Sequence, residues 1–369
     1  MLKLKATIKR YSLFIIVNLD VFKAINRLAK NITTRWLKLL SGCFPITTFL
    51  CLLIIVPDGL IAQDPHFSQF YAHPLNLNPA LAGTGECGRI MAGFRNQWPG
   101  IDQTYTTASL EADRYFDALS GGVGISVLND DAAGLINTLR VGGIYAYHLK
   151  ISGEASLNAG FEATYHQQRI NWSDLIFNDM IDISSGNVSS GAEVPPTDTR
   201  VSAVDFSTGL LFGISKKYYL GVAAHHLTEP DLSYYSSDVA ALYRTYTLHG
   251  GAHFILVESY YPNRKGELSL NPNVLYQQQK NAQQLNLGLN LSYHPFTLGI
   301  WYRHNFSNPD AMIGFIGLNH KYFNFGYSYD FTMSGLKGES GGAHEVTVAL
   351  LFGCEGKRKK PGAIKCPEF

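Results

Sequence analysis

The chain has 369 residues, of which 16% are charged and 12% aromatic, and it contains 35 glycines. Few charges combined with many aromatic residues and glycines favour an all-β protein and argue against an ordinary cytosolic enzyme. Residues 1–62 carry nine of the 30 basic side chains and two of the 29 acidic ones, which leaves residues 63–369 with a net charge of −6. This balance indicates no basic surface suited to nucleic acid.

The first 62 residues are predicted to form an N-terminal extension and an export signal. "RWLKLL" supplies positive charge, "FPITTFLCLLIIV" supplies an apolar core, and "GLIA" ends in a small residue. Cleavage after Ala62 would leave Gln63 as the first mature residue. A transmembrane anchor is the alternative, although the apolar run is short for one. The long basic stretch before Arg35 suggests a translation start assigned too far upstream.

The next segment, "QDPHFSQFYAHPLNLNPALAGTGE" (63–86), predicts neither a long helix nor a strand. Its prolines remove backbone donors, and its Asn residues favour turns. Three of its side chains, Phe67, Phe70 and Tyr71, are aromatic and need burial.

Alternation of apolar and polar residues with a period of two runs through the rest of the chain. This pattern predicts strands with one dry and one wet face. We expect about fourteen strands, joined mostly by short turns and interrupted by a long loop at 171–200. The clearest strands are "LRVGGIYAYHLKI" (139–151), "EASLNAGFEATYH" (154–166), "LNLGLNLSY" (285–293) and "FNFGYSYDF" (323–331).

The predicted fold is a transmembrane antiparallel β-barrel, and a soluble β-sandwich is the alternative. The strands approach the roughly ten residues that cross a bilayer at a tilt. Their dry faces are apolar along their whole length, as lipid contact requires. With the export signal, this places the protein in a Gram-negative outer membrane. The expected parts are an extension and signal (1–62), a periplasmic plug segment (63–86), the barrel (87–353) and a basic periplasmic tail (354–369).

The same alternation predicts where individual side chains point. Glu162, His166, Arg303 and Asp330 are expected to face the lumen. Aromatic residues near strand ends are expected to form the girdles at the two membrane interfaces. They are Trp98, Tyr115, Phe116, Tyr218, Tyr219, Trp301, Tyr302 and Tyr322.

No motif predicts a catalytic, cofactor or metal site. "GTGECG" (83–88) has the glycine spacing of a dinucleotide loop but is followed by a strand pattern rather than a helix. His225 and His226 with Glu229 resemble metal ligands, yet adjacent residues of a strand face opposite sides, so strand-end polar residues are favoured. An outer-membrane hydrolase using loop residues is a further alternative.

Three of the five cysteines lie after Ala62, namely Cys87, Cys354 and Cys366. Cys354 and Cys366 flank a basic run, and they predict either a disulfide or two free thiols. The run is interpreted as a docking strip for acidic periplasmic partners, or as a solvated end near anionic headgroups. Its residues are Lys357, Arg358, Lys359 and Lys360.

Several motifs together resemble the PorP/SprF family, outer-membrane proteins of the type IX secretion and gliding systems of Bacteroidota. They are "DPHFSQFYAHPLNLNPALAGT", "FRNQWPGI", "YTTASLEADRYF" and the ending "GKRKKPGAIKCPEF". The resemblance implies a barrel that supports export or surface anchoring of a large secreted protein, often an adhesin. It implies periplasmic or lipoprotein components of the machinery as further partners, and neither enzyme activity nor a cofactor. The matching residues are Asp64, Phe67, Ser68, Gln69, Asn76, Asn78, Pro79, Ala80, Gly83, Arg95, Asn96, Gln97 and Trp98.

We expect the segment before the first strand to fold into the periplasmic mouth of the barrel as a plug. Arg95 and Gln97 share an inward face and are predicted to bond its carbonyl groups, with Trp98 on the opposite face as an interface anchor. The hypothesis is that plug and strand residues bind a partner; the alternative is that they only close the barrel. A passive porin-like channel is the alternative function. The hypothetical partner-binding residues are Phe67, Gln69, Phe70, Tyr71, Asn76, Asn78, Pro79, Arg95, Asn96, Gln97 and Trp98.

Overall fold

Fifteen antiparallel strands form one sheet in the computed structural model, which describes residues 64–101, 104–181, 188, 191, 193–215, 217–235, 240–258, 266–306, 308–333 and 340–354. Among these residues no helix is long and apolar enough to cross a membrane. The strands are β1 (Gly88–Gln97), β2 (Tyr105–Phe116), β3 (Gly121–Ala132), β4 (Ile136–Lys150), β5 (Ala155–Ile170), β6 (Arg200–Ile214), β7 (Tyr218–His225), β8 (Thr245–Ala252), β9 (Phe254–Val257), β10 (Leu268–Gln279), β11 (Ala282–Tyr293), β12 (Phe296–Asn305), β13 (Asn308–Asn319), β14 (Phe323–Thr332) and β15 (Ala343–Phe352).

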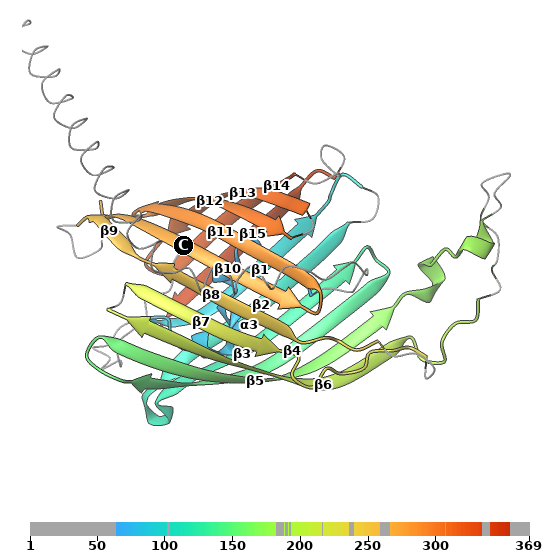
Figure 1. Cartoon of the computed structure of the whole chain (residues 1–369), viewed down its shortest axis with the longest axis horizontal. Coiled ribbons are helices and arrows are strands. Elements are labelled where there is room, and N and C mark those ends of the chain that lie inside the picture. The colour runs from blue at the N-terminus through green and yellow to red at the C-terminus, as the bar shows by residue number, and fades with distance from the viewer. Residues whose placement is uncertain are drawn as a thin grey trace, which may run out of the picture. The chain divides into compact units, whose positions relative to one another are not determined.

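The sheet closes on itself. β1 pairs with both β2 and β15, and β10 pairs with both β8 and β11, so neighbours follow one another around the whole wall. His253 separates β8 from β9, and both of these strands pair with β10, so they share one position. The prediction of a fourteen-strand antiparallel barrel is confirmed (Figure 1).

The barrel is polar inside and apolar outside. On β14, Ser328 and Asp330 are buried, whereas Phe325 and Phe331 are 39% and 57% exposed. This is the reverse of a water-soluble protein, and it suits a wall whose outer face contacts lipid. The inward positions predicted for luminal residues are confirmed, because these side chains are all buried: Glu162, His166, Arg303 and Asp330.

Three of the residues predicted for the aromatic girdles do not face the membrane. Tyr115, Tyr219 and Trp301 are 7%, 9% and 2% exposed, so they face the lumen rather than the lipid. Each sits beside another predicted girdle residue, and neighbours on a strand point to opposite faces. Only one of each pair can reach the membrane interface, as Phe116 and Tyr218 do at 43% and 48% exposure.

The two ends of the barrel differ in their connections. At the long-loop end lie the connections after β1, β3, β5, β7, β10, β12 and β14, the longest being 171–199 between β5 and β6. At the short-turn end lie tight turns such as 117–120 and 151–154, together with the start of β1 and the end of β15. Short turns and strand termini typically face the periplasm. In Figure 1 the described part of the 171–199 loop projects from the barrel on the right.

A disulfide joins Cys87 to Cys354 at the short-turn end. The two residues flank the seam where β1 pairs with β15, next to the pair Gly88 and Phe352. Cys354 is therefore neither paired with Cys366 nor a free thiol, so both alternatives expected for it are wrong. Barrel closure brings together cysteines that are 267 residues apart, which sequence proximity does not reveal. Cys366 and the four basic residues of the tail lie outside the described residues.

The disulfide predicts a specific gel pattern. The denatured, non-reduced chain should migrate faster than the reduced chain, because a loop of 267 residues keeps it compact. Cys87→Ser should abolish this difference, whereas Cys366→Ser should keep it. Electrophoresis of the three proteins in denaturant, with and without reductant, checks this. A difference lost on Cys366→Ser would contradict the pairing.

Candidate functional site

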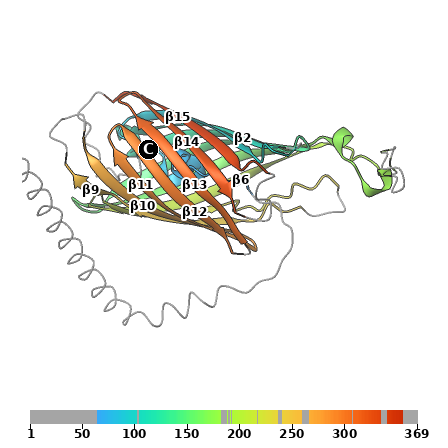
Figure 2. The same cartoon turned by 90° about the horizontal axis from the view of Figure 1, so that it is seen from above.

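Residues 64–86, the luminal segment, lie inside the barrel. They form three single turns, η1 (Phe70–Ala72), α3 (Pro74–Leu77) and η2 (Pro79–Leu81). The strands enclose this blue segment in both Figure 1 and Figure 2. Prolines start α3 and η2, where a missing backbone N–H costs nothing. The segment is packed like a core rather than a loose loop, since Leu75 and Ala80 are 0% exposed.

The segment runs the full depth of the lumen. At its amino end, Asp64 contacts Gln279 and Thr245, the last residue of β10 and the first of β8, both at the long-loop end. At its carboxyl end, the Gly83 N–H donates to Asp113 Oδ2 at 2.6 Å, three residues from the short-turn end of β2. The predicted plug at one mouth is therefore wrong in extent, because only the last residues lie at the short-turn end.

Buried carboxylates of the wall hold the backbone of the segment. Glu345 accepts hydrogen bonds from the N–H groups of Ser68 and Gln69 at 2.7 and 2.9 Å. Glu111 accepts from the Leu75 N–H at 2.9 Å. Irregular turns leave such amides without ladder partners, and a charged acceptor binds them strongly. The prediction that Arg95 and Gln97 bond carbonyls of the segment is wrong, since Arg95 donates to the Ser68 hydroxyl instead and Gln97 accepts from Arg95.

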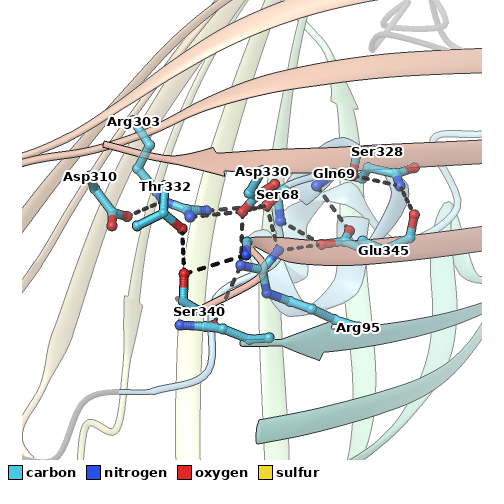
Figure 3. Close-up of polar contacts among 12 residues, drawn as sticks. Ser68, Gln69, Arg95, Arg303, Asp310, Ser328, Asp330, Thr332, Ser340 and Glu345 are labelled. Atoms are coloured by element: carbon cyan, nitrogen blue, oxygen red, sulfur yellow. Dashed lines mark hydrogen bonds and ion pairs between the residues drawn. The ribbon is translucent and has the colours of Figure 1, made fainter. Parts of the chain in front are cut away.

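Arg95 nevertheless lies at the centre of a cluster of buried polar side chains, drawn in Figure 3. Its Nη2 is 2.9 Å from Asp330 Oδ2, and its Nη1 is 3.2 Å from Glu345 Oε2. Arg303 Nη2 lies 2.8 Å from the same Asp330 oxygen. Both guanidinium groups donate to Ser68 Oγ, at 2.6 and 3.1 Å. Two cations and two anions from β1, β12, β14 and β15 thus converge on one serine of the segment.

Aromatic packing secures the middle of the segment. The rings of Phe70 and Tyr71 lie 5.0 and 5.5 Å from Trp301, edge-on and stacked respectively. Tyr71 also meets Phe315 edge-on at 5.6 Å. Such pairs each add about 0.5–1.5 kcal/mol to the gain from burial. Trp301 was predicted to lie at the interface, and here it anchors the segment.

Two wall glycines allow the segment to approach closely. A Cβ on Gly122 would lie 2.1 Å from the carbonyl oxygen of Ala82, and one on Gly160 would lie 2.2 Å from the Ala80 nitrogen. These are backbone atoms, which cannot swing aside as a flexible side chain can. The inner face of the wall is therefore shaped to this segment.

His226, the first residue after β7, anchors the amino end. Its Nε2 is 2.8 Å from Asp64 Oδ2 and its Nδ1 is 2.6 Å from Asp205 Oδ2. A positive φ of 56° turns its side chain inward together with that of His225, so the expectation that the two face opposite sides is wrong. Among the described residues, no group of three or more His, Cys, Asp or Glu side chains is arranged so that it could hold a metal ion.

The environment of His226 predicts a pH-dependent stability. Burial disfavours the imidazolium, but the carboxylates of Asp64 and Asp205 outweigh burial and raise the pKa of His226 from 6.5 to about 9. A raised pKa contributes stability that is complete below pH 6.5 and is lost as the pH rises through 9. We expect the free energy of unfolding to fall by about 2–4 kcal/mol over this range. Urea unfolding at several pH values measures it.

The matched variants for this test are His226→Asn and His320→Asn. His226→Asn removes the titrating group, so the free energy of unfolding of this variant should not fall as the pH rises through 9. His320 is exposed at the short-turn end, so His320→Asn should keep the wild-type slope. An equal slope in wild type and His226→Asn would show that another group is responsible.

The family is decided by a sequence comparison. A model described as type IX secretion system membrane protein PorP/SprF matches residues 60–350. The chain belongs to the PorP/SprF family. The search of curated proteins gives no match. The family and the barrel with its apolar outer face together place the protein in the outer membrane.

Solved structures with a similar fold are outer-membrane barrels of low identity. Omp33 of Acinetobacter baumannii is 8% identical, with 72% of this chain and 98% of that chain covered and a TM-score of 0.41. The CymD monoaromatic hydrocarbon channel is 10% identical, covering 76% and 93%, with a TM-score of 0.42. The toluene transporter TodX of P. putida is 10% identical, covering 74% and 92%, with a TM-score of 0.41. None of these similarities bears on function.

The residues matched to the PorP/SprF signature do not form a single cluster in the structure. Asn78 donates to the Leu210 and Val222 carbonyls at 3.1 and 3.2 Å, and Gln97 accepts from Arg95 at 3.4 Å. Asn96 lies on the same outward face of β1 as Phe94, two residues before it. Trp98 follows that strand, and its ring is edge-on to that of Tyr105 at a centroid distance of 5.4 Å. The luminal segment contains the other hypothetical partner-binding residues, Phe67, Gln69, Phe70, Tyr71, Asn76 and Pro79.

Sequence reasoning missed three of the residues that hold the segment, Glu111, Asp113 and Glu345. All are buried on the inner face, at 0%, 3% and 0% exposure. Their signal was present, because each is an acidic residue at a wet position of an alternating strand. Charged residues at inward positions of a narrow barrel need partners, and the segment supplies them.

Proposed function

We propose that this protein is a non-enzymatic component of the type IX secretion machinery, supporting the export or surface anchoring of a large secreted protein. The supporting observation is the luminal segment, which packs against the wall through the depth of the lumen. A barrel filled in this way has no wide pore, and its two ends are the surfaces at which partners can bind. The partners are a secreted protein such as an adhesin, and periplasmic or lipoprotein components of the machinery.

The long-loop end is the proposed contact for the secreted protein. Ile176 and Val194, in the connection between β5 and β6, are 61% and 72% exposed. Large apolar side chains exposed beyond the membrane-spanning strands favour a protein interaction. The short-turn end is the proposed contact for the machinery. The described chain ends there at Cys354, and a basic run follows it in the sequence, namely Lys357, Arg358, Lys359 and Lys360.

The test is a mild-detergent pull-down of the C-terminally tagged protein from its own outer membrane, followed by mass spectrometry. We expect a large secreted protein and type IX components. The variant I176S/V194S should lose the secreted protein and keep the machinery, and changing the four basic tail residues to Ser should do the reverse. Each variant controls for the other. Recovery of the intact, heat-modifiable barrel alone would contradict the proposal.

Conductance in a planar bilayer separates this function from that of a passive porin-like channel. The wild type should show no stable, large ion-conducting steps, because residues 64–86 occupy the lumen. Deleting residues 64–82 removes most of that filling and should raise conductance if the wall still closes. Large steady steps in the wild type would favour the channel.

A further inference from the structure

The two ends of the described chain lie at opposite ends of the barrel. An even number of strands returns the chain to its starting side, so β1 begins and β15 ends at the short-turn end, where Cys87 is bonded to Cys354. The luminal segment adds one further crossing. Its amino end at Asp64 therefore lies at the long-loop end.

Asp64 is fixed there by groups from four parts of the wall. Its N–H donates to Gln279 Oε1 at 3.0 Å, and its Oδ2 lies 2.8 Å from His226 Nε2 and 3.1 Å from Thr245 Oγ1. Arg140 Nη1 lies 3.4 Å from its Oδ1. Gln279 ends β10, Thr245 begins β8 and His226 follows β7, so three of the four groups mark the long-loop end of their strands.

Burial along the segment shows the direction in which it leaves the barrel. Asp64, Pro65 and His66 are half-buried, whereas residues 67–75 are all buried. At the other end, Glu86 is exposed where the chain leaves the lumen to begin β1. The chain is thus accessible at both ends of its path and enclosed between them.

We infer that the amino end of the luminal segment, at Asp64, opens onto the long-loop face of the barrel. A partner bound at that face then meets the amino end of the segment directly. The inference concerns topology and is independent of which protein the barrel serves.

Single-cysteine labelling of intact cells tests this inference. In a Cys366→Ser background, Pro65→Cys is compared with Val194→Cys at the long-loop end and Gly153→Cys at the short-turn end. A membrane-impermeant maleimide should label P65C and V194C in intact cells, and G153C only after the outer membrane is permeabilised. The background without an added cysteine gives the baseline, and heat-modifiable mobility shows that each barrel is folded.

A second measurement does not depend on the reactivity of one thiol. An epitope inserted directly before Asp64 should bind antibody on intact cells. The inference is overturned if P65C and the epitope behave like G153C, if they stay inaccessible in both states, or if V194C is labelled only after permeabilisation.

Discussion

Replacing Asp330 by Asn is expected to lower the free energy of unfolding by about 3–5 kcal/mol. Asp330 is 2% exposed and lies within 2.9 Å of nitrogen atoms of both Arg95 and Arg303. Removing its charge leaves two buried guanidinium groups close together with one carboxylate fewer to balance them. It also weakens the acceptor for the Ser68 hydroxyl, at 2.7 Å, so the luminal segment should loosen. Urea unfolding in detergent, followed by tryptophan fluorescence, measures the change.

The control for this prediction is Asp117→Asn. Asp117 lies exposed in the turn between β2 and β3, so the same chemical change should alter stability by less than about 0.5 kcal/mol. If D330N and D117N have equal stabilities, the buried cluster is not what holds the segment in the barrel.

The fold was predictable because its pattern is repeated in every strand. Alternation in "FNFGYSYDF" predicts which residues of β14 face the lumen, and Ser328 and Asp330 are indeed buried there. The same rule, applied strictly, would also have prevented the errors in the girdle, since Trp301 and Tyr302 cannot both face lipid. The contacts that closure of the sheet creates between the two ends of the chain were not predicted. Closure makes Cys87 and Cys354 neighbours, although nothing in their separation suggests a bond.

The arrangement of the luminal segment could be predicted only in part. Its aromatic residues and prolines correctly indicated a buried element outside the sheet. Its path could not be predicted, because contacts such as that of Ser68 with Glu345 join residues 277 positions apart. Acidic residues occur at inward positions along the depth of the wall, among them Glu111 and Asp113. Buried carboxylates need hydrogen-bond donors, and N–H groups of the luminal segment supply them.

Replacing Gly160 by Ala is expected to destabilise the protein by about 1–3 kcal/mol, as overpacking of a tight core does. The added methyl group would lie 2.2 Å from the Ala80 nitrogen and 2.3 Å from the Pro79 carbonyl carbon, so the backbone of the segment must move. This shift should weaken the hydrogen bond from Asn158 to the Ala80 carbonyl, now 3.3 Å long. In the folded barrel, chymotrypsin should then cleave after Phe70 or Tyr71, which are buried in the wild type.

Gly143→Ala on the adjacent strand β4 makes the same chemical change at a position where a Cβ would meet nothing within 4 Å. It should leave both the unfolding curve and the chymotrypsin pattern unchanged. A difference between the two variants ties the effect to contact with the luminal segment rather than to alanine in a strand. If G160A behaves like G143A, the segment rests loosely against the wall. The barrel could then release it, and the closed lumen on which the proposed function rests would no longer follow.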